Sequence, residues 1–237
     1  MPIIKIIIYL LRMLIATIIT IYYSFLIIFK PNLTPVFFNK SKTRWAYKLI
    51  KLFSVKLEVI GKENIADNQN YIFISNHQSL FDIPVVFYTL PENSVIIYKQ
   101  ELEDFPVFGS CMKKSPLISI KRENARNSMA GLDKAIESMK ENLSVIIYPE
   151  GTRSKDGTIG QFKRGAFLMA TRAEKPIVPV VLIGTKEVLD KKSRKIFNHK
   201  VEVQIFKPIS IDHNLNKVQE LALMNEVREI ILKNYKK

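Results

Sequence analysis

The stretch YIFISNH, residues 71–77, decides the fold class. It begins with an unbroken run of β-forming residues, which is typical of a strand covered on both faces of a sheet. A second such run, VII at residues 145–147, begins about 70 residues later and belongs to the segment 144–148. Five further segments have the composition of strands: residues 56–60, 94–98, 117–120, 177–183 and 201–206.

Helical patterns alternate with these strands. Apolar residues repeat at intervals of three and four between residues 129 and 139, and again between residues 218 and 231. Residues 41–53 form a short amphipathic pattern with a single apolar stripe of Trp45, Leu49 and Phe53. The alternation predicts an α/β domain with a mostly parallel central sheet of about seven strands, flanked by helices.

The amino-terminal segment is apolar from residue 3 to residue 29, apart from Lys5, Arg12 and a few hydroxyl groups. Its longest uncharged run, residues 13–29, is slightly shorter than the roughly 20 residues that a spanning helix needs. A spanning helix and a helix lying in one leaflet are both compatible with this length, and a buried core helix is a third alternative. No small-x-small cleavage site precedes Lys30, which argues against a signal peptide.

A cluster of basic residues follows the apolar segment: Lys30, Lys40, Lys42, Arg44, Lys48 and Lys51. Such a cluster predicts that the following domain lies on the cytoplasmic side of a membrane, near anionic headgroups. We therefore expect a membrane anchor over residues 1–40 and a catalytic domain over residues 41–237. The expected location is the cytoplasmic membrane, with the catalytic domain facing the cytoplasm.

The formal net charge of +14, from 36 basic and 22 acidic residues, implies an anionic partner. Nucleic acid is disfavoured because the chain has no zinc-finger spacing, RNA-binding signature or basic heptad pattern. The remaining candidates for the anionic partner are an anionic lipid and a phosphorylated substrate. The single cysteine, Cys111, excludes an intrachain disulfide and a multi-cysteine metal site.

His77 and Asp82 are the first candidates for chemistry. His77 directly follows the strand at residues 71–75, and ligands of open α/β sheets bind beyond the carboxyl ends of strands. Positions five apart do not share a helix face, so the pairing requires His77 in a loop or at a helix start, with Asp82 one turn inside. The imidazole could then take a proton from an alcohol while the carboxylate fixes its tautomer. A helix-capping histidine and a locally bonded aspartate would show the same spacing.

A turn at residues 149–153 follows the strand at residues 144–148. Gly151 permits a positive φ, and Arg153 can bind a phosphate through two parallel hydrogen bonds. Lys163 and Arg164 add positive charge further on, and Glu150 could orient Arg153 or accept from a substrate hydroxyl. An ordinary polar loop would explain the same residues.

Basic side chains follow four of the expected strands: His77, Lys99, Arg122 and Arg153. If those strands are parallel, their carboxyl ends lie at one edge of the sheet and the four side chains converge. A base that removes a hydroxyl proton, together with cations that bind a phosphate, makes one coherent site.

In these motifs the chain resembles the glycerolipid acyltransferases, most closely the bacterial 1-acylglycerol-3-phosphate acyltransferases. The family's Asn-His-x-x-x-x-Asp block matches residues 76–82. Its Phe-Pro-Glu-Gly-Thr-Arg-Ser block matches residues 148–154, with Tyr148 in place of phenylalanine. The resemblance covers roughly residues 70–185, and the two blocks together are highly specific. The family's Lys-x-Glu-Leu run, with a later proline and glycine, is matched by Lys99, Glu101, Leu102, Pro106 and Gly109. Its Val-Pro-Val block is matched by residues 178–180.

One block departs from the family pattern. Gly-x-x-Phe-Ile-x-Arg corresponds to residues 116–122, where Ile120 and Arg122 match but the glycine and the phenylalanine do not. We expect this departure to affect the choice of acceptor more than the reaction.

The resemblance implies a role for each matched residue. His77 would be the base and Asp82 its partner. The phosphate of the acceptor would be bound by Arg122, Glu150, Gly151, Thr152 and Arg153. The supporting residues would be Asn76, Lys99, Lys163 and Pro179. Pro179 would shape the acyl-binding wall, although a core strand explains that proline equally well.

The resemblance also implies the reaction, which is acyl transfer to the sn-2 hydroxyl of 1-acyl-sn-glycerol 3-phosphate, a lysophosphatidic acid. The product would be phosphatidic acid, made for phospholipid biosynthesis at the bacterial inner membrane. Acyl carrier protein or coenzyme A would deliver the acyl group as a thioester substrate, and neither a cofactor nor a metal is implied.

Three alternatives remain open. The acceptor could be glycerol 3-phosphate or another lysolipid. A thioesterase or lipase would use water in place of the acceptor, but the chain lacks the Gly-x-Ser-x-Gly nucleophile elbow. A non-catalytic binder of anionic lipid would have no use for the pair of His77 and Asp82.

Overall fold

A computed structural model describes residues 3–121, 125–140, 142–154, 156–189, 199–211 and 215–235. Across these ranges, seven strands form one sheet in the order β1-β7-β6-β2-β5-β3-β4. The strands are β1 (Val55–Ile60), β2 (Ile72–Ser75), β3 (Ser94–Lys99), β4 (Ile118–Ile120), β5 (Ser144–Ile147), β6 (Ile177–Ile183) and β7 (His199–Ile205).

Five neighbouring strands, from β6 through β2, β5 and β3 to β4, run parallel. β7 pairs with β6 in the antiparallel direction, and β1 follows β7 in parallel. β2 and β5 lie near the centre and are buried at every position, as their unbroken apolar runs predict. The predicted mostly parallel sheet of about seven strands is confirmed.

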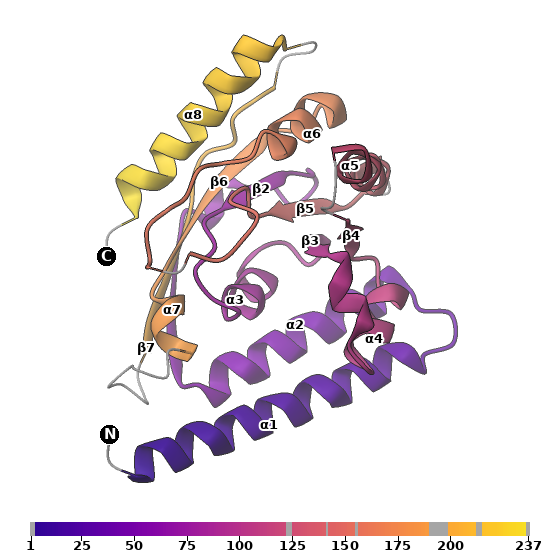
Figure 1. Ribbon diagram of the computed structural model, residues 1–237, viewed down its shortest axis with the longest axis vertical. Coiled ribbons are helices and arrows are strands. Elements are labelled where there is room, and N and C mark those ends of the chain that lie inside the picture. Colours follow the sequence, from indigo (N-terminus) through magenta and orange to yellow (C-terminus); the bar gives the residue numbers. More distant parts are fainter. Residues whose placement is uncertain are drawn as a thin grey trace.

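Helices cover both faces of the sheet (Figure 1). One face packs against α5 (Ala125–Lys140), α6 (Gly165–Ala173) and α8 (Lys217–Asn234). The other face packs against α2 (Pro35–Leu52) and α3 (Asp82–Thr89), and α1 (Ile3–Ile28) lies outside α2. Short helices complete the fold: α4 (Phe108–Lys114), α7 (Thr185–Leu189), and 3-10 turns at Lys62–Asn64 and Gln100–Asp104.

Helix α2 contains the predicted amphipathic segment but begins six residues earlier, at Pro35 rather than residue 41. The Thr34 hydroxyl accepts from the backbone N–H of Phe37, and the proline at the first helical position suits a helix start. Leu49 and Phe53 are buried, as the predicted stripe requires. The domain boundary expected between residues 40 and 41 falls inside α2, so the amino-terminal segment shares a helix with the rest of the domain.

Lys42 differs from the expectation that it attracts headgroups. Its side chain is buried, and its Nζ donates to the carbonyl oxygen of Glu92 at 2.7 Å and to that of Ser94. Burial lowers the pKa of Lys42 to about 7. This lysine therefore ties α2 to the start of β3 rather than facing a membrane surface.

Helix α1 lies alongside the domain over its length. Near its start the Tyr9 hydroxyl donates to the carbonyl oxygen of Leu189, and past its middle the Thr20 hydroxyl accepts from Trp45 Nε1. At its end Lys114 Nζ donates to the carbonyl oxygen of Ile28 at 2.6 Å. Among the helices described, α1 alone is long and apolar enough to cross a membrane, with a mean hydropathy of 2.2.

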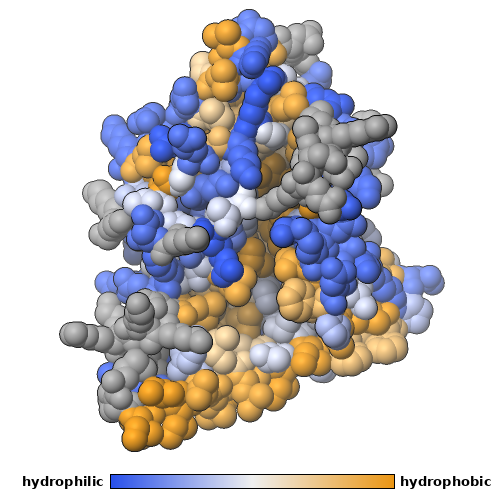
Figure 2. All heavy atoms as spheres, viewed as in Figure 1, coloured by the Kyte–Doolittle hydropathy of each residue, from blue (hydrophilic) through white to orange (hydrophobic). Residues whose placement is uncertain are grey.

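The outer face of α1 is apolar and exposed, and Figure 2 shows it as a hydrophobic band along one edge of the molecule. Its exposed side chains are Ile3, Ile4, Ile6, Ile7, Leu10, Leu11, Leu14, Ile18, Ile21, Tyr22 and Phe25, followed by Phe29 just beyond the helix. A continuous exposed apolar surface of this kind marks an interaction site for another apolar phase.

Candidate active site

Asn76 fixes the start of the loop that carries His77. Its side-chain amide donates to the carbonyl oxygen of Leu182 at 2.9 Å and accepts from the Leu182 N–H at 2.8 Å. The side chain of Asn76 thus bonds to β6 as a strand backbone would, one residue after β2 ends. The supporting role predicted for Asn76 has a physical basis, because the chain can leave the sheet at His77 in one defined direction.

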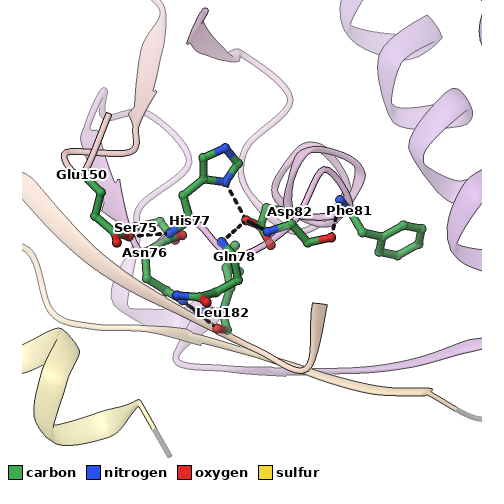
Figure 3. A network of polar contacts seen from close by, with 9 residues as sticks. Ser75, Asn76, His77, Gln78, Phe81, Asp82, Glu150 and Leu182 are labelled. Carbon is green, nitrogen blue, oxygen red and sulfur yellow. Dashed lines mark hydrogen bonds and ion pairs between the residues drawn. The ribbon is translucent and has the colours of Figure 1, made fainter. Parts of the chain in front are cut away.

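His77 and Asp82 form a close pair, with 2.7 Å between His77 Nδ1 and Asp82 Oδ2 (Figure 3). The same carboxylate oxygen accepts from the backbone N–H groups of Gln78, at 2.7 Å, and Ser79, at 2.9 Å. Asp82 is the first residue of α3 rather than one turn inside, where the positive end of the helix favours a carboxylate. The predicted pairing is present, and it fixes the His77 ring and the loop at once.

The second ring nitrogen of His77 points away from Asp82 (Figure 3). The His77 side chain is 16% exposed, whereas Asp82 is fully buried. The ring of Tyr148 stacks on the imidazole, with 4.1 Å between the ring centroids and 17° between the planes. The imidazole is therefore held by Asp82 through one nitrogen and covered on one face by Tyr148, while the other nitrogen points away from Asp82.

Glu150 links the two sequence blocks. One carboxylate oxygen accepts from the backbone N–H of His77 and the other from that of Gly160, both at 2.8 Å. In the reverse direction, the backbone N–H of Ser154 donates to the carbonyl oxygen of His77 at 2.9 Å. Burial raises the pKa of the Glu150 carboxyl, and the two backbone hydrogen bonds oppose that rise.

Both carboxylate oxygens of Glu150 accept hydrogen bonds from backbone donors, and a carboxylate repels a phosphate group. Glu150 therefore positions the His77 backbone, and its predicted contact with the acceptor phosphate stays a prediction. Figure 3 shows its side chain reaching the His77 backbone from a separate segment.

The turn after β5 presents a cationic surface. Gly151 has a φ of +72°, and a Cβ at this position would lie 2.9 Å from Lys163 Nζ. The backbone N–H of Lys163 donates to the carbonyl oxygen of Pro149 at 2.9 Å, which holds Lys163 over the turn. Thr152 and Arg153 are exposed. Arg164 points elsewhere, since its Nε donates to Glu220 on α8 at 2.6 Å.

The order of the strands brings three of the four predicted basic residues to one edge of the sheet. His77 follows β2, Arg153 follows β5 and Lys99 ends β3, and these three strands are adjacent and parallel. Their carboxyl ends therefore lie at one edge of the sheet. Lys99 is exposed and forms an ion pair with Glu101 at 2.8 Å. Arg122 lies outside the described residues, so its predicted phosphate contact stays a prediction.

Pro179 lies in β6, where it is buried and opposite Ile74 of β2. That position makes it part of the core sheet, and an acyl-binding wall stays a prediction. Sequence reasoning also missed a feature of Tyr148. It identified this residue only as a departure from the family block, and the ring contact with His77 could not be deduced from chain order.

A model of the Acyltransferase family matches residues 56–183. A chloroplastic 1-acyl-sn-glycerol-3-phosphate acyltransferase of Brassica napus is 34% identical over 73% of this chain and 52% of its own length. The human 1-acyl-sn-glycerol-3-phosphate acyltransferase beta is 34% identical over 72% of this chain and 62% of its own length. The chain thus spans about half the length of the plant relative and less than two thirds of the human one.

A solved structure of an acyltransferase is similar to nearly the whole chain. The 1-acyl-sn-glycerophosphate acyltransferase PlsC of Thermotoga maritima has a TM-score of 0.80 and 25% sequence identity, with 98% of this chain and 94% of that chain covered. The family match includes both blocks that build the His77 site. The chain belongs to the Acyltransferase family.

Proposed function

We propose that the protein transfers an acyl group from a thioester to the sn-2 hydroxyl of 1-acyl-sn-glycerol 3-phosphate, giving phosphatidic acid. The observation that carries this proposal is the 2.7 Å contact between His77 and Asp82, at the sheet edge where the Arg153 turn also ends. The names of the relatives and of the structural neighbour support the same acceptor.

In the proposed mechanism His77 Nε2 removes the proton of the sn-2 hydroxyl. The alkoxide attacks the thioester carbonyl carbon, and the imidazolium that forms is stabilised by Asp82 through Nδ1. The tetrahedral intermediate collapses by breaking its carbon–sulfur bond. The leaving thiolate takes the proton from His77, so that the free base is regenerated without a covalent acyl-enzyme.

The acceptor phosphate is assigned to the cationic turn. A pocket at the carboxyl end of β5 is lined by Tyr148, Gly151 and Lys163 and by apolar residues such as Ile97 and Ile120. A lysolipid headgroup has this combination of a phosphate and an apolar neighbour. In the proposal Arg153 and Lys163 bind the phosphate, Thr152 and the Gly151 backbone lie against it, and Arg122 joins them from the segment after β4.

The apolar face of α1 is proposed to lie in one leaflet of a membrane. Polar contacts tie α1 to the domain near its start, past its middle and at its end. A helix crossing the bilayer would leave the domain behind at one surface, so such contacts along its length favour the leaflet position. We propose the cytoplasmic face of a bacterial inner membrane, as the basic residues near α2 suggest.

An apolar cavity between α1, α2, α3 and α4 is proposed to receive an acyl chain. Its wall includes Tyr23, Phe87 and Cys111, together with Ile83, the residue that follows the catalytic candidate Asp82. A chain held there would begin near the His77 loop and end beneath the membrane-facing helix.

Product analysis tests the proposed function. The protein is incubated with 1-acyl-sn-glycerol 3-phosphate and either acyl carrier protein or coenzyme A thioesters, and lipids are identified by mass spectrometry. Phosphatidic acid formation is expected, and comparison of the two donors identifies the carrier. Transfer to glycerol 3-phosphate alone would move the assignment to that acceptor. Release of free fatty acid without transfer would support a hydrolase and reject the proposal.

A further inference from the structure

Two buried polar atoms beside His77 lack hydrogen-bond partners among the described residues. One is the hydroxyl oxygen of Tyr148 and the other is Asp82 Oδ1. Buried polar atoms in folded proteins are nearly always hydrogen-bonded, to protein or to water, because leaving one unpaired costs about 1–3 kcal/mol. Two such atoms in one site therefore require an explanation.

The two atoms belong to residues that flank the same imidazole. Tyr148 stacks on the face of the His77 ring, whereas Asp82 binds the edge of that ring through Oδ2. All three hydrogen bonds that Asp82 accepts go to Oδ2, which leaves Oδ1 free to accept another. The tyrosine is a donor and the carboxylate oxygen is an acceptor, so the two are chemically matched.

The pKa of the Tyr148 hydroxyl also indicates that this group lies near Asp82. Burial raises the pKa of the Tyr148 hydroxyl well above its usual value, and the negative charge of Asp82 raises it further. Tyr148 is therefore a neutral donor at physiological pH. The Asp82 charge acts on this hydroxyl across a buried region, where electrostatic interactions are screened little.

We propose that Tyr148 is a positioning residue whose hydroxyl donates a hydrogen bond to Asp82 Oδ1 through one bridging water molecule, and thereby tunes the basicity of His77. This inference rests on the proposed function, in which His77 is the base. A donor on Oδ1 withdraws part of the carboxylate charge that would otherwise stabilise the imidazolium.

Other titratable groups also surround the pair. Glu150, at the end of β5, binds the His77 backbone through its carboxylate. Tyr235, which follows α8, is near enough that the charges of Asp82 and Glu150 raise its pKa, after the larger effect of burial. Neither group donates to Asp82 Oδ1.

The Tyr148→Phe variant isolates the hydroxyl, because phenylalanine keeps the ring that stacks on His77. Removing the donor strengthens the effective charge of Asp82, so His77 should bind its proton more tightly. The acid limb of the pH profile of kcat/KM should therefore move to higher pH in the variant, with KM for the acceptor little changed.

Histidine NMR measures this change without any substrate. The chain has three histidines, so ¹³C labelling at the histidine Cε1 positions gives three signals in detergent micelles, and His77→Gln assigns one of them. Tyr71→Phe is the matched control. It removes a hydroxyl that bonds to Ala66 and Gln69 at the opposite end of β2, and it should leave the His77 titration unchanged.

Identical His77 titrations in the wild type and Tyr148→Phe would overturn the proposed hydrogen bond. So would an equal rise in the Tyr71→Phe control or a fall in the Tyr148→Phe variant. A wild-type protein that transfers no acyl group would reject the proposed function instead, and the NMR titration would still decide whether the hydroxyl reaches Asp82.

Discussion

The carboxyl edge of the sheet and the outer face of α1 handle polar and apolar groups in opposite ways. At the edge, a buried carboxylate and a buried amide form hydrogen bonds with backbone groups. Glu150 bonds to His77 and Gly160, and Asn76 bonds to Leu182. On α1, large apolar side chains such as Leu10 and Leu14 remain more than half exposed.

The difference indicates which task each region performs. A base must be held in one orientation, and hydrogen bonds are directional enough to do so. Partitioning into lipid is non-directional and scales with the apolar area removed from water. The sheet edge is therefore suited to chemistry and the α1 face to lipid contact, and changes in the two regions should have different kinetic signatures.

The largest effect is expected from His77→Ala, which removes the proposed base. Turnover should fall by at least the ~10²–10⁴ typical of general-base catalysis, because His77 alone takes the hydroxyl proton in the proposed mechanism. The fold should remain, since the His77 backbone keeps its bonds to Glu150 and Ser154. Steady-state turnover with lysophosphatidic acid measures the first expectation, and thermal unfolding by circular dichroism measures the second. Near-normal turnover would remove His77 from the mechanism.

Arg153→Ala tests the phosphate-binding half of the same edge. Hydrogen bonds to charged groups contribute about 1.5–3 kcal/mol, which predicts a rise in KM for lysophosphatidic acid of about 10- to 100-fold. Turnover at saturation should change less, because the base is untouched. Kinetics with lysophosphatidic acid and with a phosphate-free monoacylglycerol measure the difference.

The matched control for Arg153 is Arg172→Ala on α6, where the exposed arginine pairs with Asp133 at 2.7 Å. That variant should behave as wild type. An equal loss toward both acceptors in Arg153→Ala would show that Arg153 does not bind the phosphate.

Glu150→Gln tests whether the link between the two blocks matters for catalysis. Glutamine has one acceptor oxygen, so an amide NH₂ must face the backbone N–H of either His77 or Gly160. An unpaired buried donor costs about 1–3 kcal/mol, which lowers the melting temperature, and the displaced loop should reduce turnover by about tenfold. Calorimetry and turnover assays measure both effects. Unchanged turnover in a destabilised variant would limit Glu150 to a purely structural role.

The smallest effect on turnover is expected on α1. Replacing Leu10 and Leu14 together with glutamine removes apolar area from the proposed lipid contact, at about 1.5–3 kcal/mol for each fully buried leucine. Binding to vesicles should weaken, and the apparent KM for acceptor in vesicles should rise several-fold, while kcat in detergent stays close to wild type.

Co-sedimentation with vesicles measures the binding of the α1 variant. The matched control changes Val218 and Leu221 to glutamine, because these exposed apolar residues lie on α8, at the opposite side of the molecule from α1 (Figure 1). Equal losses of vesicle binding in the two variants would contradict a specific lipid contact at α1.

Much of the fold was predictable from local patterns. The predicted strands at residues 71–75, 144–148 and 177–183 agree with β2, β5 and β6 to within one residue at each end. The start of α2 was placed too late: Phe38 already lies on the buried face of the helix, and the helix begins at the cap formed by Thr34 and Pro35. The reversal at β7 was likewise not predicted, since alternating burial does not reveal the direction of a strand.

The site was predictable in its parts but not in its connections. The block at residues 76–82 identified His77 and Asp82, and the structure joins them through Nδ1. The hydrogen bonds of Glu150 to the backbone of His77 and Gly160 could not be predicted, because these partners lie far from it in the chain. A buried lysine at position 42 was also mistaken for a surface charge, since its partners are backbone carbonyls that carry no sequence signature.

The amino-acid sequence by itself determined which segments become buried strands and which side chains carry acid–base and cationic chemistry. These properties depend on side-chain type and on spacing along the chain. Only the tertiary structure decided that β5 inserts between β2 and β3, so that a carboxylate 73 positions after His77 binds its backbone and a tyrosine covers its ring. Strand order sets these contacts because hydrogen bonds and ring packing depend on distance in space, and that distance is fixed only when the sheet has formed.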